Sequence, residues 1–66
     1  MRVKVNGEPQ EVPEGATVRA LVLLLGANPE AVAVALNGEV VPRGRQESTP
    51  LAPEDRVEII RAVGGG

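Results

Sequence analysis

The sequence predicts an α+β fold in which one helix covers one face of a four- or five-stranded mixed sheet. Apolar residues recur with a period of two in several short segments and with helical spacing in only one. Two Asn-Gly pairs, the strongest short signal for a β-hairpin, each separate two such short segments. A chain of 66 residues is one small domain. We expect this domain to span residues 1–62, followed by a flexible tail at 63–66.

The first hairpin begins at the first residue. Residues 1–5, "MRVKV", alternate apolar and charged side chains, and Asn6 and Gly7 supply a tight turn. Residues 9–12 form the return strand. Because Pro9 has no backbone N–H to donate, this second strand is expected at an edge of the sheet.

The one helix follows a Pro-Glu-Gly turn. Thr17 is a suitable N-cap residue, and Gly26 stands where a helix often ends in a left-handed residue. Between them, four apolar residues with i, i+3, i+4 and i+7 spacing form one face: Val18, Leu21, Val22 and Leu25.

The second hairpin follows the helix. Residues 31–36, "AVAVAL", alternate with a period of two and predict a strand. Asn37 and Gly38 make the turn, and residues 40–41 return briefly before Pro42 ends the pairing.

The last strand is expected over residues 56–63, after an irregular segment at 43–55 in which Leu51 closes the core. If the first and last strands lie side by side in the centre, the connection through the helix is the usual right-handed crossover. The predicted core is Val3, Val5, Val12, Val18, Leu21, Val22, Leu25, Val34, Leu36, Val41, Leu51, Val57 and Ile59.

Composition excludes several classes of function. The net charge is -2, and the chain has no aromatic side chain and no basic cluster, so direct binding of nucleic acid is not expected. With no Cys and no His, it can form neither a disulfide nor a thiolate or imidazole zinc site. The longest apolar run is too short to span a bilayer, so we expect a cytoplasmic protein, monomeric when free.

Side-chain catalysis is also not expected. Without His, Cys or Tyr, the three hydroxyls of Thr17, Ser48 and Thr49 have no imidazole base to activate them. Glu54 and Asp55 are adjacent carboxylates in a turn, an arrangement typical of solvated surface. The internal glycines fit turns and caps rather than a phosphate-binding loop, so we expect no cofactor or metal to be bound by this chain.

Two surface features can be interpreted in more than one way. Arg43 and Arg45 either form a small basic patch for a phosphate or an acidic partner, or belong to a soluble loop. Ala33, Ala35 and Ile60 project from the sheet face opposite the helix and either form a flat partner-binding area or are exposed by chance.

The final "VGGG" is difficult to explain by folding, because glycine loses the most backbone entropy on ordering. It is either a frayed chain end or cloning remnant, or a functional tail. Four extended residues reach about 13 Å. In the functional interpretation, this tail carries the α-carboxylate of Gly66 through a narrow channel in another protein.

The sequence resembles the ubiquitin-like β-grasp family, and within it the ThiS family of sulfur carriers. The resemblance covers essentially the whole chain. It is carried by "ALNGEVVPR" at 35–43, by "L..ED.VEI" at 51–59 and by the terminal "VGGG". "NGEVVPR" is the part most characteristic of the thiamine branch.

This resemblance implies a carrier and not an enzyme. An E1-like adenylyltransferase of the ThiF type would use ATP to adenylate the Gly66 carboxylate. Sulfur from a cysteine desulfurase or a rhodanese-like donor would then give a thiocarboxylate, which supplies thiazole synthase (ThiG) with sulfur. The resemblance assigns the sulfur to Gly66 and the tail in the partner's active site to Val63, Gly64 and Gly65.

The chain departs from the family pattern at two positions. Members often carry Gly-Asp before the last strand, where this chain has Glu54-Asp55, and an aromatic residue at the position of Ala62. The second departure removes an anchor at the base of the tail.

Other functions use the same terminus or fold. These are a sulfur carrier for tRNA thiolation, the small subunit of molybdopterin synthase, and a ubiquitin-like modifier joined to lysines of target proteins. A β-grasp interaction domain with an idle tail is a further alternative.

Overall fold

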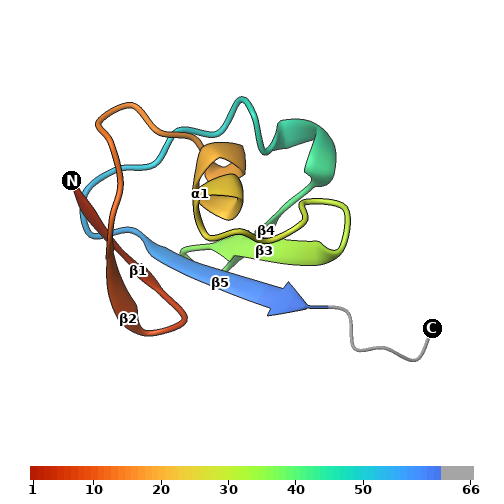
Figure 1. The fold of residues 1–66 in the computed structure, drawn as a ribbon, viewed down its shortest axis with the longest axis horizontal. Coiled ribbons are helices and arrows are strands. Elements are labelled where there is room, and N and C mark those ends of the chain that lie inside the picture. The colour runs from red at the N-terminus through yellow and green to blue at the C-terminus, as the bar shows by residue number, and fades with distance from the viewer. Residues whose placement is uncertain (62–66) are drawn as a thin grey trace.

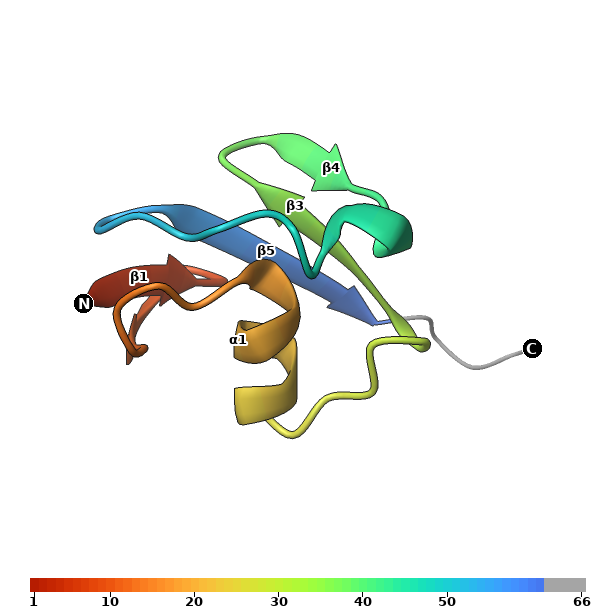
Figure 2. The ribbon, with the colours of Figure 1, turned by 90° about the horizontal axis from the view of Figure 1, so that it is seen from above.

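The computed structural model describes residues 1–61, which form a five-stranded sheet with one α-helix on one face (Figures 1 and 2). The two-layer α+β architecture predicted from the sequence is confirmed. The predicted tail, residues 63–66, lies outside the described residues. In chain order the elements are β1 (Arg2–Val5), β2 (Glu8–Glu11), α1 (Val18–Leu24), β3 (Val32–Leu36), β4 (Glu39–Val41), the 3-10 helix η1 (Arg43–Arg45) and β5 (Arg56–Arg61).

The last strand lies in the centre of the sheet, whose order is β2-β1-β5-β3-β4. It runs parallel to β1, with Lys4 opposite Arg56 and Val5 opposite Val57. On its other side it runs antiparallel to β3, with residues Val57 to Arg61 paired along the whole length of β3. The first and last strands therefore lie side by side, the arrangement considered from the sequence, and both β-hairpins flank β5.

The helix begins where the sequence predicts. The hydroxyl oxygen of Thr17 accepts a hydrogen bond from the N–H of Ala20 at 3.2 Å. The N–H groups of Val18 and Arg19 donate to backbone carbonyls of the segment between η1 and β5. Gly26 has φ +77° and terminates the helix as expected. The first turn of α1 is therefore tied to the chain that precedes β5, which fixes the helix over the sheet.

The core lies between α1 and the sheet. Val18, Leu21 and Val22 of the helix are fully buried in one cluster with Val3 of β1 and Val57 of the central strand β5. All predicted core residues lie in this cluster or pack against it, with Val5, Leu25, Leu36 and Ile59 only partly buried. The prediction omitted two further buried members, Ala16 and Val32.

The segment 43–55 is more ordered than predicted, because it begins with η1. The Arg43 guanidinium donates to the carbonyl oxygens of Pro29, at 3.2 Å, and Glu30, at 2.7 Å, and so ties η1 to the loop before β3. Gln46, which follows η1, is buried with 1% of its surface exposed. Leu51 is buried beneath the core, as expected.

Glu54 has a left-handed backbone, with φ +69°, in the turn before β5. This conformation costs a residue with a Cβ about 1–2 kcal/mol, whereas glycine adopts it freely. The turn therefore explains physically why glycine suits this position.

We expect Glu54→Gly to raise the free energy of unfolding by about 0.5–1 kcal/mol, after the entropy of glycine in the unfolded chain is subtracted. The matched control is Glu39→Gly, an exposed residue of β4 without a positive φ, which should lower stability by a similar amount. Urea denaturation followed by circular dichroism measures both. Destabilisation by Glu54→Gly would show that the turn carries no strain.

Candidate functional site

The end of β5 is the part of the fold from which residues 62–66 continue. Both Asn-Gly turns hold this strand. The Asn6 side-chain oxygen accepts from the N–H of Ile59 at 2.9 Å, and the Asn37 side-chain oxygen accepts from the N–H of Arg56 at 2.9 Å. The backbone N–H of each asparagine also donates a hydrogen bond to a backbone carbonyl of β5. The strand is thus bonded on both sides by side chains as well as by its neighbours.

At the point where β1 turns away from β5, the Asn6 side chain takes the place of a backbone hydrogen-bond partner. The register of β1 against β5 ends at Val5 and Val57, and the Asn6 side chain reaches the next free amide, that of Ile59. Its φ of +50° is tolerated by asparagine better than by most residues. Asn6 therefore extends the parallel ladder by one hydrogen bond toward the end of β5.

We expect Asn6→Ala to lower the free energy of unfolding by about 2 kcal/mol, because it removes this hydrogen bond and places alanine, which tolerates a positive φ less well than asparagine, at this position. Hydrogen exchange should show a specific loss of protection at the Ile59 amide. Asn6→Asp keeps an acceptor oxygen and should restore most of the protection. Unchanged exchange at Ile59 in Asn6→Ala would contradict the assigned bond.

The sheet face opposite α1 exposes apolar side chains near the end of β5. Ile60 is 59% exposed and lies directly opposite Ala33, which is also exposed. Val40 of β4 lies on the same face and is 72% exposed, and it was not among the residues expected there from the sequence. The period of two in the strands would have found it once the pairing of Ala35 with Val40 was known.

The prediction that Ala35 contributes to this exposed area is wrong. Ala35 lies on the expected face, but only 8% of its surface is exposed. Its direct neighbours across the strands are Val40 and Glu58, and both are larger than a methyl group. The apolar patch of the open face therefore consists of Ala33, Val40 and Ile60.

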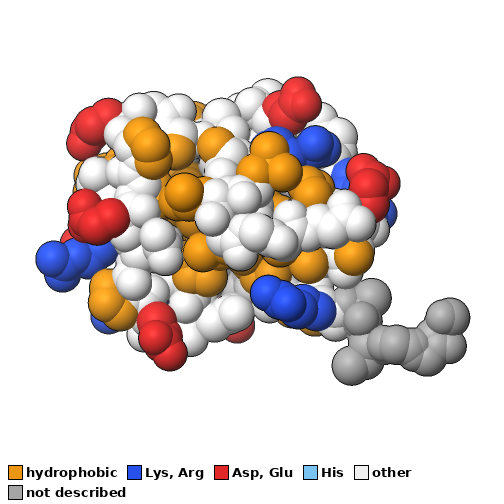
Figure 3. All heavy atoms as spheres, viewed as in Figure 1, with side chains coloured by type: hydrophobic (Ala, Val, Ile, Leu, Met, Phe, Trp, Pro, Cys, Tyr) orange, Lys and Arg blue, Asp and Glu red, His pale blue; other side chains and the backbone are white. Residues whose placement is uncertain are grey.

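The opposite side of the molecule also exposes apolar groups. Leu23 and Leu24 of α1 are 57% and 54% exposed. Figure 3 shows hydrophobic side chains at the surface in the middle of this view, with charged side chains around the rim. The face of α1 that was predicted to be buried packs on the sheet, and Leu23 and Leu24 lie outside that face.

The described side chains offer little for catalysis. The hydroxyls of Ser48 and Thr49 donate to the Arg45 carbonyl, and Thr17 caps α1. Within residues 1–61, no three His, Cys, Asp or Glu side chains are grouped so as to hold a metal ion. No helix in that part of the chain is long and apolar enough to cross a membrane. Arg43 is engaged by backbone carbonyls and does not form a free patch with Arg45.

The predicted tail residues Val63, Gly64 and Gly65 and the predicted sulfur-bearing Gly66 lie outside the described residues. They are nevertheless covered by a comparison with known families. The model of the ThiS family matches residues 3–66, which is nearly the whole chain and includes the final glycines.

The chain belongs to the ThiS family.

Solved structures of ThiS proteins have the same fold. The chain matches the crystal structure of the thiamine biosynthesis protein ThiS from Geobacter metallireducens with a TM-score of 0.85 and 39% identity, over 100% of both chains. The solution structure of a thiamine biosynthesis protein from the same organism gives a TM-score of 0.82. The fold is therefore the ubiquitin-like β-grasp expected from the sequence.

Two kinds of curated relative are similar to this ThiS family member. A thiazole synthase of Magnetococcus marinus is 39% identical over the whole chain, which spans only 20% of that longer protein. An uncharacterized protein, ycf40, of Porphyra purpurea is 36% identical over 64 residues, which are 97% of this chain and 90% of the relative. In the first relative, a segment similar to this chain is part of a thiazole synthase.

Proposed function

We propose that this protein carries sulfur for thiazole formation in thiamine biosynthesis, and that the Gly66 carboxylate is the group that carries it. The observation that supports the proposal is the match to the ThiS family across residues 3–66, which includes the terminal glycines. Similarity to thiamine biosynthesis proteins and to part of a thiazole synthase supports the same pathway. Under this proposal the protein is a carrier and not an enzyme.

The chemistry takes place at the Gly66 carboxylate. A carboxylate oxygen attacks the α-phosphorus of ATP on an E1-like adenylyltransferase of the ThiF type, which forms an acyl-adenylate and releases pyrophosphate. The terminal sulfur of a persulfide, from a cysteine desulfurase or a rhodanese-like donor, attacks the carbonyl carbon and displaces AMP. A thiol then cleaves the resulting sulfur–sulfur bond, which leaves a thiocarboxylate and a disulfide.

Activation is required because a carboxylate is a poor electrophile, whereas an acyl-adenylate carries a good leaving group. The thiocarboxylate then gives its sulfur to thiazole synthase (ThiG). ATP is used by the activating partner, so the carrier needs no cofactor of its own. Because these reactions require ATP and free thiols, we propose that the protein works in the cytoplasm, where thiols are kept reduced.

The tail that would carry the reactive group follows closely on β5 in the sequence. Gly64 and Gly65 have no side chain and that of Val63 is small, so this segment would fit a narrow active-site channel. The apolar patch of Ala33, Val40 and Ile60 lies on β3, β4 and β5, and Ile60 is close to the point where β5 ends. We propose that partners dock on this patch while they receive the tail.

Copurification tests the pathway. The chain, tagged at its N-terminus, is expressed in its native host under thiamine limitation and isolated together with its bound proteins. We expect a thiazole synthase and a ThiF-type enzyme among them. Recovery of a molybdopterin synthase large subunit or a tRNA thiolase instead would favour the rival sulfur pathways. Covalent adducts to lysines of other proteins would favour a modifier.

A further inference from the structure

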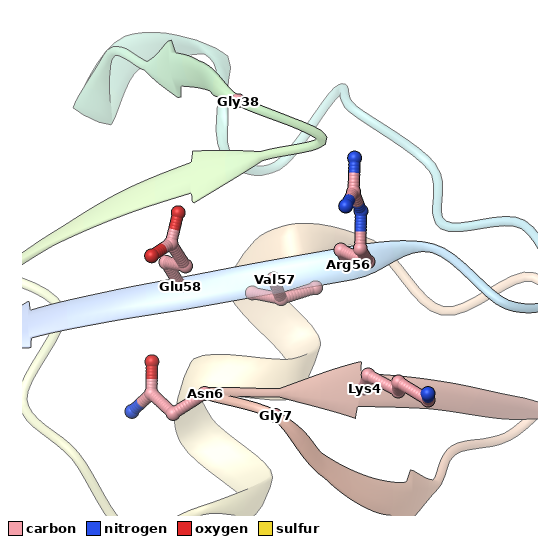
Figure 4. A pocket seen from close by; sticks show the side chains of 7 residues that line it. All are labelled: Lys4, Asn6, Gly7, Gly38, Arg56, Val57 and Glu58. Carbon is pink, nitrogen blue, oxygen red and sulfur yellow. The ribbon is translucent and has the colours of Figure 1, made fainter.

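Two positive side chains lie directly opposite each other on the open face of the sheet. Lys4 of β1 and Arg56 of β5 are register partners across the parallel pair, and both are exposed. Figure 4 shows that the two side chains diverge, with Arg56 extending toward the turn that contains Gly38 and Lys4 extending along β1. Like charges placed directly opposite on neighbouring strands destabilise a sheet.

Neither charge is neutralised by an ion pair within residues 1–61. The other basic residue of β1, Arg2, lies opposite Glu11 and forms an ion pair with it at 3.7 Å. Lys4 instead lies opposite Pro9, which carries no charge. Glu58 is the nearest acidic residue of β5 on this face, but it forms no ion pair with either cation. The fold thus keeps two like charges opposite each other, and the β2 residue opposite Lys4 offers no acidic partner.

The two cations line a hollow of about 330 Å³. Val57 lies beneath it, and Asn6 and Glu58 complete its polar wall (Figure 4). Gly7 and Gly38, from the two hairpin turns, line it without side chains, so that both ends stay open. This volume is sufficient for one or two carboxylate side chains, and its strongest recognition groups are an ammonium and a guanidinium.

We propose that this hollow receives acidic side chains of thiazole synthase, so that Lys4 and Arg56 form an electrostatic docking point for that partner. The inference rests on the proposed function. Charge complementarity selects an acidic group, and the relative in which a similar segment is part of a thiazole synthase selects the partner. A local conflict that costs stability and serves no internal contact is typical of a functional site.

The position of the hollow fits a partner that also receives the tail. Arg56 and Ile60 point to the same face and are separated by four residues of β5, or about 13 Å. An interface of standard size covers about 800 Å² on each partner, which is wide enough to contain both points. The synthase would therefore carry an apolar spot beside its channel and carboxylates about 13 Å from it.

The test compares two variants with the same change in net charge. Lys4→Gln/Arg56→Gln removes two positive charges, and Arg45→Glu makes the same change on exposed η1, in the layer of α1 (Figure 1). Affinity for the purified thiazole synthase of the same organism is measured by calorimetry at low and moderate salt. We expect the double variant to bind about tenfold more weakly at low salt and to lose most of the salt dependence. Arg45→Glu should bind within about twofold of the unmodified chain.

Two further measurements exclude a merely structural effect. The double variant should have a denaturation midpoint equal to or above that of the unmodified chain, because the opposed charges are gone. It should also form the thiocarboxylate normally at saturating activating enzyme. These results, with weaker synthase binding, would confirm the docking point.

The negative outcomes are distinct. If the unmodified chain binds the synthase and the double variant binds equally well, the docking point is wrong and the proposed function stands. If only binding to the activating enzyme is weakened, the hollow exists for a different partner and the assignment to the synthase is wrong. If the unmodified chain does not bind the synthase, the proposed function itself fails.

Discussion

A chain shortened by Gly65 and Gly66 is expected to lose thiocarboxylate formation by at least about a hundredfold in a reaction reconstituted with the activating enzyme, ATP and a persulfide donor. The shortened chain still ends in a carboxylate, but that group stops about 7 Å short of its position in the intact tail. Because even a displacement of about 1 Å can cost a hundredfold in rate, the remaining carboxylate should not react.

A single substitution distinguishes the effect of tail length from the effect of side-chain size in the tail. Gly65→Val keeps the length of the tail and its carboxylate but adds a β-branched side chain, which a channel built for glycine should exclude. We expect Gly65→Val to be nearly as inactive as the deletion. Neither change should alter the denaturation midpoint, because the core of the described residues extends no further than Ile59.

Mass spectrometry of the intact chain after the reaction gives the result directly. If the shortened chain acquired sulfur at the rate of the unmodified chain, the chemistry would not be at Gly66. If Gly65→Val reacted normally, the tail would not enter a narrow channel. An interaction domain with an idle tail predicts no effect of either change on binding or on growth without thiamine.

Leu21→Ala is expected to have the largest effect on stability, a loss of about 3 kcal/mol in the free energy of unfolding. Leu21 is the largest fully buried side chain and lies at the centre of the inner face of α1. A core of this size rarely supplies more than about 3–5 kcal/mol in total. The variant should therefore be substantially unfolded at room temperature and lose carrier activity in proportion.

Leu24→Ala provides a matched control on the same helix. The same atoms are removed, but Leu24 is 54% exposed, so the loss should be below about 1 kcal/mol. Alanine and leucine have similar helix propensity, and the comparison isolates burial. Urea denaturation measures both variants. Equal losses would show that α1 does not pack on the sheet through Leu21.

The features predictable from sequence are those determined by local chemistry. Both Asn-Gly turns, the Thr17 cap and the spacing of Val18, Leu21 and Val22 each specify a structure within a few residues. These signals established the order of the elements, and the structure shows that the first strand lies beside the last, the arrangement with which the crossover rule is compatible. The alternation in the last strand correctly separated buried Val57 from exposed Ile60.

The features that were missed depend on contacts between distant segments. Ala35 is buried only because Val40 and Glu58 lie beside it, and neither pairing can be read from a period of two. The burial of Gln46 depends on the return of η1 to the start of α1. The opposition of Lys4 and Arg56 requires the register between strands that are more than 50 residues apart.

The measurement that tests the central claim most directly is the intact mass of the chain purified from its native host during thiamine starvation. We predict a fraction heavier by the replacement of one oxygen with sulfur, located by fragmentation at Gly66 and absent when thiamine is supplied. A terminus that remains an ordinary carboxylate under starvation, in a host that is making thiazole, would contradict the assignment of this chain as the sulfur carrier.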